Sequence, residues 1–253
     1  MGRGFEKRKK IIMDCLQRTQ EMRVTDLIDL TGAAVATVRR DLLELEKQKL
    51  IVRTFGGIRS VDQKSLVDRT FEQRANCQAL EKQRIAAAAA ELVTPGMTIA
   101  IDSGTTCMYL ASMLKTKAPL RIITSALAVI ETLGGVPDIE INLVGGRFRV
   151  ANLDFYGAIS INTFKQFHAD MVFMSCDALL PEHGAFAHDQ ESAAISQALI
   201  SCASRRVLMC DSRKIGQSGA FRVFSPDQID YLVTDHTNPE LDAAGYNTII
   251  AKL

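Results

Sequence analysis

The chain has 253 residues, of which 47% are hydrophobic and 23% are charged. This composition is typical of a soluble globular protein with a large core and excludes a disordered or fibrous chain. No run of about 18 uncharged apolar residues occurs, and the basic residues 1–10 lead into no long apolar stretch, so neither a membrane span nor a secretory signal is expected. The six cysteines form no CxxC pair, which favours reduced thiols in a cytoplasmic protein without a metal site or cofactor.

Positive charge is concentrated at the N-terminal end. Residues 1–60 contain 13 Lys and Arg against 8 Asp and Glu, whereas the remainder contains 17 against 21. A basic segment followed by an acidic one is typical of a protein whose small N-terminal part alone contacts nucleic acid. A solvated basic helix would give the same charge, so the motifs must decide.

The first 60 residues predict three helices followed by a β-hairpin. Apolar residues recur at helical spacing in three stretches, at residues 6–17, 24–30 and 34–49. A hairpin follows, with one strand at 51–54 and a second after the glycine turn at Gly56 and Gly57. This order predicts a winged helix-turn-helix domain over residues 1–60. The polar, weakly patterned residues 61–80 are expected to form a linker.

The third helix carries the candidate DNA contacts. Val38 and Leu42 fall on one side of it, whereas Thr37 and Arg40 fall on the other. In the major groove an arginine can bind guanine or phosphate with two hydrogen bonds, and a threonine can contact the thymine methyl group. A solvated basic face is the alternative, but the helix-turn-helix spacing and the glycine hairpin together favour DNA. The expected DNA-binding residues are Ala34, Ala36, Thr37, Arg39, Arg40, Arg53, Gly56 and Gly57.

Residues 81–253 alternate between apolar strands and helices. Strands are expected at residues 98–101, 120–124, 139–144, 171–175, 206–210, 231–234 and 248–251. Helices are expected between several of them, at residues 105–114, 127–133 and 191–203. Apolar strands separated by helices predict an α/β domain with a mostly parallel sheet that is covered on both faces.

Polar motifs follow several of these strands. The segment from Asp102 to Thr106 lies between a strand and a helix, where backbone amides and hydroxyls can hold a phosphate group. The same residues could simply cap the helix, so the motif alone leaves both interpretations open. In a parallel sheet, however, the loops after the strands share one edge and can converge on one ligand. The expected ligand-binding residues are Asp102, Ser103, Gly104, Thr105, Thr106, Thr124, Ser125, Gly146, Arg147, Asp177 and Lys214.

These motifs together resemble the DeoR-type family of bacterial regulators of sugar metabolism. The family's Thr-Ile-Arg-Arg-Asp-Leu and Arg-x-His-Gly-Gly motifs are matched by residues 37–42 and 53–57. Its Asp-Ser-Gly-Thr-Thr, Thr-Asn-Ser, Gly-Gly-x-x-Arg-like, Gly-x-Asp-Gly and Asp-Ser-Ser-Lys signatures are matched by residues 102–106, 124–125, 145–147, 175–178 and 211–214. The match spans nearly the whole chain, and Arg74, Glu81 and Lys82 resemble the family's entry into its second domain.

The chain departs from the family pattern in both domains, and the second position of the Thr-Asn-Ser signature is absent between Thr124 and Ser125. Ala33 and Ala34 stand where Val-Ser commonly opens the recognition helix, and Phe55 replaces the wing histidine. Ser175 and Ala178 stand where the family usually has glycine. These changes bear on the operator sequence and on the ligand rather than on the mode of DNA binding.

The resemblance implies a transcriptional regulator. Repression of carbohydrate-metabolism genes is the first expectation for its role. It implies a ribose-5-phosphate-isomerase-like fold for the effector-sensing and oligomerisation domain, residues 81–253. Residues 102–106 and Lys214 would hold the phosphate group, and Asp177 and Arg147 would hold sugar hydroxyls or an acid group. The implied partners are a double-stranded DNA operator, a phosphorylated sugar effector and further copies of the chain in a dimer or tetramer. No membrane partner is implied.

Two other functions remain as alternatives. An isomerase-like enzyme would need a carboxylate base, for which Glu191 is available, and a nearby lysine. Residues 179–190 contain no lysine, so His183 or His188 would have to replace it. The other alternative is a DNA-binding protein whose second domain serves assembly without a ligand. The helices at 127–133 and 191–203 are possible oligomer surfaces, although core packing explains their apolar residues equally well.

Overall fold

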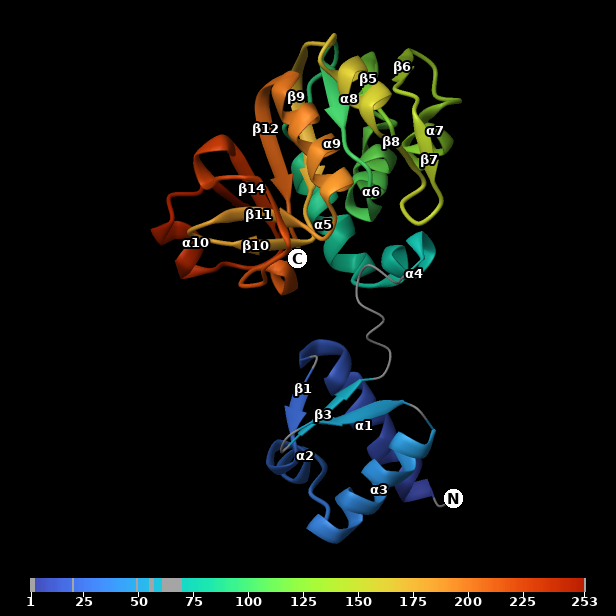
Figure 1. The fold of residues 1–253 in the computed structure, drawn as a ribbon, viewed down its shortest axis with the longest axis vertical. Helices are drawn as coiled ribbons and strands as arrows, with labels where there is room; N and C mark the ends of the chain where they lie inside the picture. The colour runs from blue at the N-terminus through green and yellow to red at the C-terminus, as the bar shows by residue number, and fades with distance from the viewer. Residues whose placement is uncertain (1–2, 20, 49, 55–56, 61–69, 253) are drawn as a thin grey trace. The chain divides into compact units, whose positions relative to one another are not determined.

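The structure is a computed structural model, and it describes residues 3–19, 21–48, 50–54, 57–60 and 70–252. The chain divides into two compact units, residues 1–68 (unit 1) and residues 69–253 (unit 2), which are drawn in Figure 1. Each unit has a hydrophobic core of its own. Each can therefore be understood from its own residues.

The described part of unit 1 contains three helices and a three-stranded antiparallel sheet of order β1-β3-β2. Its elements are α1 (Arg3–Thr19), β1 (Glu21–Arg23), α2 (Val24–Thr31), α3 (Val35–Lys47), β2 (Ile51–Thr54) and β3 (Gly57–Ser60). The three predicted helices and the predicted hairpin are present. Gly32 ends α2 in the left-handed conformation, at φ 61°. Strand β1 was not predicted, because three residues are too few to show an alternating pattern.

The second half of the predicted linker is helical, which corrects the prediction for residues 71–80. The elements here are α4 (Phe71–Asn76) and α5 (Ala79–Ala90). Thr70 Oγ1 accepts a hydrogen bond from Gln73 N at 3.2 Å, and the Gln73 side chain accepts one from Thr70 N at 3.1 Å. This capping box, together with the buried Phe71 side chain, stabilises a helix in a polar stretch. Residues 61–69 of the predicted linker lie outside the described residues.

A seven-stranded sheet forms the centre of unit 2, in the order β15-β14-β12-β9-β4-β5-β6. Its strands are β4 (Thr98–Ile101), β5 (Leu120–Thr124), β6 (Ile139–Leu143), β9 (Ala169–Ser175), β12 (Ala203–Met209), β14 (Tyr231–Thr234) and β15 (Thr248–Ile250). Every neighbouring pair is parallel, so the prediction of an α/β fold with a mostly parallel sheet is confirmed. The strand order reverses between β4 and β9, and in such sheets ligands bind beyond the carboxyl ends of the strands at this point.

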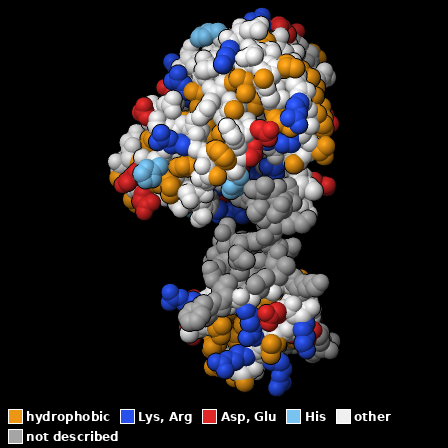
Figure 2. All heavy atoms as spheres, viewed as in Figure 1, with side chains coloured by type: hydrophobic (Ala, Val, Ile, Leu, Met, Phe, Trp, Pro, Cys, Tyr) orange, Lys and Arg blue, Asp and Glu red, His pale blue; other side chains and the backbone are white. Residues whose placement is uncertain are grey.

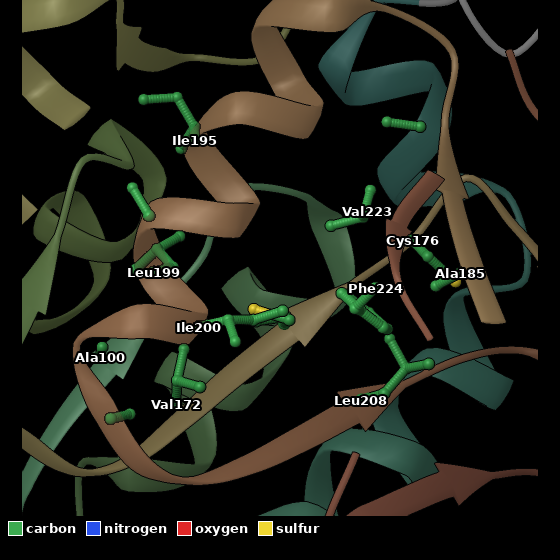
Figure 3. Packing of buried hydrophobic residues seen from close by; sticks show 14 of the residues in the cluster. Ala100, Val172, Cys176, Ala185, Ile195, Leu199, Ile200, Leu208, Val223 and Phe224 are labelled. Atoms are coloured by element: carbon green, nitrogen blue, oxygen red, sulfur yellow. The ribbon is translucent and has the colours of Figure 1, made fainter. Parts of the chain in front are cut away.

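Helices cover both faces of the sheet. They are α6 (Thr105–Leu114), α7 (Leu127–Leu133), α8 (Ala158–Phe164), α9 (Gln190–Ser201) and the short α10 (Pro239–Ala243). Residues of α5, α6 and α7 pack on one face, and residues of α8 and α9 pack on the other. Figure 3 shows Leu199 and Ile200 of α9 near Val172 of the sheet, and all three belong to the same hydrophobic cluster. Because both of their faces are buried, the central strands β4, β5 and β9 are largely apolar, which made them visible in the sequence, whereas the edge strand β6 alternates apolar and polar residues.

Two smaller sheets in unit 2 were not predicted. The hairpin of β7 (Arg147–Arg149) and β8 (Asp154–Tyr156) follows β6. A second sheet, of order β10-β11-β13, consists of β10 (Ala178–Leu180), β11 (Gly184–Ala187) and β13 (Phe221–Phe224). As for the two helices considered as oligomer surfaces, Leu133 and Leu199 are fully buried in the cores, so core packing accounts for them.

Candidate functional site

Helix α3 presents the predicted DNA-binding residues on its outer side. Val38 and Leu42 are buried in the core of unit 1, whereas Arg39 and Arg40 are exposed and Thr37 is half-buried. Ala34 and Ala36 are exposed too, and Ala34 precedes the helix without a side-chain cap. Figure 2 shows Lys and Arg side chains on the described surface of unit 1 that is in view. The arrangement is that of a basic helix face open to solvent.

Asp41, in the middle of the Arg-Arg-Asp-Leu motif, has a role that sequence reasoning missed. Its carboxylate is buried and accepts hydrogen bonds from Arg8 Nε at 2.6 Å and Arg8 Nη2 at 3.1 Å. Arg8 belongs to α1, so this forked pair fastens α3 to α1 and fixes the direction of the neighbouring arginines. The signal was available, because Asp41 shares the buried side of the helix with Val38, Leu42 and Leu45.

The predicted wing residues lie on the hairpin that follows α3. Arg53 in β2 is exposed, and its Nε lies 3.3 Å from Glu46 Oε2 at the end of α3. Its Nη2 also donates to Arg39 O at 3.5 Å, so the strand and the helix are connected. Gly57 begins β3 and is buried. Gly56 lies outside the described residues.

In unit 2 the predicted ligand-binding motifs all follow strands of the parallel sheet. Residues 102–106 follow β4, Ser125 follows β5, and residues 145–147 follow β6. Asp177 follows β9, and residues 211–214 follow β12. We call these loops the carboxyl edge. Because β4 and β9 flank the reversal of strand order, the loops after them lie where a ligand is expected.

One side of the carboxyl edge is a network of carboxylates and hydroxyls joined by an arginine. Arg149 donates from Nε and Nη2 to the two oxygens of the buried Asp154, at 3.0 and 2.8 Å. Asp154 also accepts from Ser103 Oγ at 2.9 Å. Nη1 of Arg149 lies 3.4 Å from Asp189 Oδ1 and donates to Ser192 Oγ at 2.9 Å. We call these five residues the carboxylate network.

Asp102 lies beside this network and is only 5% exposed. Its carboxylate accepts from Ser103 N at 2.8 Å and from Ser196 Oγ at 3.4 Å, and no ion pair is formed with it among the described residues. Burial raises the pKa of Asp102 to about 7, although its hydrogen bonds act in the opposite direction. Asp102 can therefore be protonated or ionised near neutral pH.

The phosphate cradle predicted at residues 102–106 requires its glycine. Gly104 has φ +116°, and a Cβ atom there would lie 2.9 Å from Ser175 Oγ across the reversal of strand order. Thr105 and Thr106 are buried in the first turn of α6. A side chain at position 104 would therefore be strained and would crowd the loop after β9.

The other side of the carboxyl edge gathers three cations around one carboxylate. Lys214 Nζ lies 3.8 Å from Asp211 Oδ2 and donates to Cys176 O at 2.6 Å, and Arg213 Nε lies 3.3 Å from Asp211 Oδ1. Lys82, which is 4% exposed, donates to a backbone carbonyl of α4. Burial, followed by repulsion from Lys214, lowers the pKa of Lys82 to about 8. We call Lys82, Arg213, Lys214 and Asp211 the cation cluster, and its positive charge exceeds its negative charge.

Lys82 was not among the predicted site residues. It lies on the buried side of α5 together with Ile85, Ala86 and Ala89, at helical spacing. A lysine on the apolar side of an alanine-rich helix is the signal that could have revealed it, because a buried ammonium group needs partners.

Six buried polar atoms have no hydrogen-bond partner among the described residues. Ser125 Oγ and Asp211 Oδ2 lie in the loops of the carboxyl edge, where Asp211 Oδ2 has Lys214 Nζ at 3.8 Å, and the others are Arg74 Nε, His188 Nε2, Arg206 Nε and Tyr246 Oη. The backbone N of His188 donates to Asp177 Oδ2 at 2.9 Å, which brings this histidine to the loop after β9. Buried polar groups are normally paired, so unpaired ones near the carboxyl edge are candidates for contact with a polar ligand.

Three of the predicted ligand residues have roles within the fold. Thr124 Oγ1 donates to Ile101 O at 2.7 Å and accepts from a backbone amide, so its hydroxyl is used between β4 and β5. A Cβ atom at Gly146 would lie 2.1 Å from Ser160 Oγ, so glycine permits close packing against α8. Arg147 is exposed, with its guanidinium 5.1 Å from the centre of the Tyr156 ring. The arginine of the network is instead Arg149, which the Gly-Gly-x-x-Arg spacing itself reaches.

The enzymatic alternative would use Glu191 as its carboxylate base. Glu191 is exposed in the first turn of α9. Within the described ranges, no group of three or more His, Cys, Asp or Glu side chains is arranged to hold a metal ion. Over the same part of the chain, no helix combines the length and apolar character needed to cross a membrane.

Comparison with known proteins agrees with the two-unit organisation. Residues 8–64 match the DeoR-like helix-turn-helix domain, and residues 77–236 match the DeoR C terminal sensor domain. The chain is 29% identical to a putative aga operon transcriptional repressor of Escherichia coli O157:H7, over 93% of this chain and 88% of the relative. It is 31% identical to the lactose phosphotransferase system repressor of Streptococcus mutans, over 91% of this chain and 92% of the relative.

Among solved structures, ribose 5-phosphate isomerase A from Methanocaldococcus jannaschii matches with a TM-score of 0.40 and 14% identity, over 53% of each chain. The two family models cover the helix-turn-helix and most of unit 2, and the relatives carry the names of transcriptional repressors rather than enzymes. The chain belongs to the DeoR family of transcriptional regulators.

Proposed function

We propose that the chain represses carbohydrate-metabolism genes in the cytoplasm and that a phosphorylated sugar controls its affinity for DNA. The observation that carries the proposal is the division of the carboxyl edge into two sides of different chemistry. The cation cluster suits an anionic group, whereas the carboxylate network suits hydroxyl groups. A sugar phosphate has both kinds of group in one small molecule.

We infer that the two sides are close enough to share one ligand. Among the charges that influence Arg74 are Asp177, Asp154 and Arg149, and the Arg74 carbonyl accepts the hydrogen bond of Lys82. Lys214 and Asp102 in turn both influence the buried Cys107. These couplings link the cation cluster to the carboxylate network through residues in between.

The names of two relatives support a sugar-related effector. One relative is a repressor of a lactose phosphotransferase system, and another is the glycerol-3-phosphate regulon repressor of Escherichia coli K12, 28% identical. The cradle of residues 102–106 adds backbone amides that a phosphate group accepts readily. Asp102, Asp177 and Lys214 therefore remain ligand-binding residues in this proposal, joined by Arg149 and Lys82.

DNA binding is assigned to α3 and the hairpin of unit 1. One winged helix contacts only a short half-site of DNA. Tight DNA binding therefore requires at least two copies of unit 1, held together by an assembly of two or more chains. We therefore expect a homo-oligomer. Arg39 and Arg40 are exposed and would contact bases or phosphates. Arg53 on the hairpin would leave its ion pair with Glu46 and bind a phosphate of the DNA backbone.

A ligand panel tests the proposal. Melting temperature is measured with sugar phosphates, the parent sugars and inorganic phosphate, and affinity for DNA selected from a random pool is measured with every hit. We expect a sugar phosphate to raise the melting temperature and to weaken DNA binding, and Lys214→Met to remove both effects. Lys165→Met, at an exposed lysine after α8, is the matched control. DNA binding that no sugar phosphate changes would leave unit 2 as an assembly domain.

The enzymatic alternative has a direct test. Because Glu191 is exposed and residues 179–190 contain no lysine, we expect no isomerisation of ribose 5-phosphate. Ribulose 5-phosphate forming in proportion to the protein concentration, and lost in Glu191→Gln, would establish an enzyme instead.

A further inference from the structure

Arg74 on α4 makes more contacts than a helix surface requires. Its Nη2 donates to Ala151 O and to Asn152 Oδ1, each at 2.7 Å. Its guanidinium lies 5.9 Å from the centre of the Phe71 ring. These contacts connect α4 to a segment more than 70 positions away in the sequence.

The segment that Arg74 contacts is the turn of the β7–β8 hairpin. That hairpin supplies Arg149 and Asp154, the central pair of the carboxylate network. The backbone carbonyl of Arg74 accepts from Lys82 of the cation cluster. Helix α4 is thus joined through one residue to both sides of the carboxyl edge.

The guanidinium of Arg74 also has a spare donor. Its Nε is buried and makes no hydrogen bond, although Asp177 and Asp154 lie near enough to influence its charge. A buried, unpaired donor costs free energy unless a ligand satisfies it. An anionic oxygen placed between the two sides would accept this hydrogen bond.

We propose that Arg74 is a ligand-binding residue of the carboxyl edge and that α4 is the helix that responds to occupancy of the site. The proposal rests on the proposed function. An anionic oxygen accepts from Nε while Nη2 holds the hairpin turn, so binding draws α4, the hairpin and the ligand together. Helix α4 is the first helix of unit 2 and directly follows residues 61–69 and Thr70 in the sequence.

Hydrogen–deuterium exchange of the full chain, with and without inorganic phosphate, tests this assignment. We expect phosphate to slow exchange in residues 102–106 and also in α4 and the hairpin turn. Arg74→Lys keeps the charge but lacks the Nε donor and the fork. It should weaken phosphate binding about tenfold and abolish the slowing in α4, while saturating phosphate still protects residues 102–106.

Two further variants separate the contacts. Asn152→Ala removes one acceptor at the turn but leaves Nε, so it should speed exchange in the hairpin and change phosphate affinity less than threefold by our rough expectation. Arg121→Ala, at an exposed arginine paired with Glu140 on the sheet, is the matched control and should match the unaltered chain.

The outcomes distinguish this proposal from the proposed function. Protection of residues 102–106 without any change in α4, or an Arg74→Lys variant that behaves like the unaltered chain, would overturn the role of Arg74 alone. Absence of protection everywhere would overturn the anion site itself, and the role of Arg74 with it.

Discussion

Both units contain a buried aspartate held by an arginine fork, but the two pairs differ in what surrounds them. In unit 1, Asp41 accepts both of its hydrogen bonds from Arg8, which fixes α3 on α1. In unit 2, Asp154 shares its oxygens between Arg149 and Ser103, and Arg149 continues to Asp189 and Ser192. The first pair is closed and holds a helix in place. The second is open in the sense that Arg149 also contacts Asp189 and Ser192, so the pair continues into the carboxylate network.

The largest expected effect comes from breaking the open pair. Asp154→Ala leaves the Arg149 guanidinium and the Ser103 hydroxyl without their shared partner. We expect the free energy of unfolding of unit 2 to fall by about 3–5 kcal/mol, because a buried charge loses its counterion. Urea unfolding measures this, with the exposed Glu182→Ala as control. A loss below about 1 kcal/mol, the size expected of a surface pair, would show that the network is solvated.

The second expected effect is a pH dependence of the stability of unit 2, caused by Asp102. Asp102 keeps its proton to about pH 7 in the folded chain, whereas an unperturbed aspartate loses it near pH 3.8. The unfolded chain therefore binds fewer protons between these pH values, and the stability of unit 2 falls as the pH rises through this range. Asp102→Asn removes the dependence.

The quantity to compare is the free energy of unfolding of Asp102→Asn minus that of the unaltered chain. We expect this difference to be larger at pH 8 than at pH 4 by roughly 3–4 kcal/mol. Urea titrations of both proteins at the two pH values measure the difference. The same difference at pH 4 and pH 8 would mean that Asp102 is ionised throughout.

Variants at neighbouring positions of α3 should affect either the stability of unit 1 or its DNA binding. Asp41→Ala is expected to lower the free energy of unfolding of unit 1 by roughly 1.5–3 kcal/mol, since a charged hydrogen-bonding group loses its partner. Arg40→Ala should leave that stability unchanged and weaken DNA binding by roughly 1–3 kcal/mol if Arg40 contacts a base. Denaturant unfolding and gel shifts on both variants decide the matter. An unchanged gel-shift midpoint would remove Arg40 from the interface.

The smallest expected effect concerns Lys82, whose pKa is lowered to about 8. Sulfate keeps the same charge across this range, so its affinity should fall about tenfold per pH unit once Lys82 loses its proton above pH 8. The groups that face Lys82 are Lys214, Asp211, Arg213 and Cys77. Lys82→Arg should flatten the profile between pH 7 and pH 9.5, as calorimetry can show. A profile that stays steep in this variant would show that Lys82 is not the titrating group.

The sequence predicted the large sheet well and the site only in part. The central strands of the parallel sheet are buried on both faces, so they were visible in the sequence as short, largely apolar runs. The β7–β8 hairpin was not, because Arg147–Arg149 and Asp154–Tyr156 show no such run. Helix α4 depends on a capping box in a polar stretch that seemed typical of a linker.

The sequence predicted the candidate-site residues that directly follow strands. It did not predict those that reach the same edge from other segments. Residues 102–106, Asp177 and Lys214 lie at the shared edge because strand direction alone determines it. Lys82 and Arg74 reach that edge from helices before the sheet, and Arg149 reaches it from a hairpin. Such contacts depend on packing between distant segments, which local spacing does not encode.

The separate core of each unit has an evolutionary consequence. Because unit 1 buries its own apolar residues, recombination within residues 61–69 can join it to another sensor domain. Such an exchange leaves the hydrophobic core of each unit intact. Lineages can therefore retarget a metabolite sensor to new promoters, or give an old promoter a new sensor, in a single genetic exchange. Modularity of this kind lets one architecture diversify into regulators of many different nutrients.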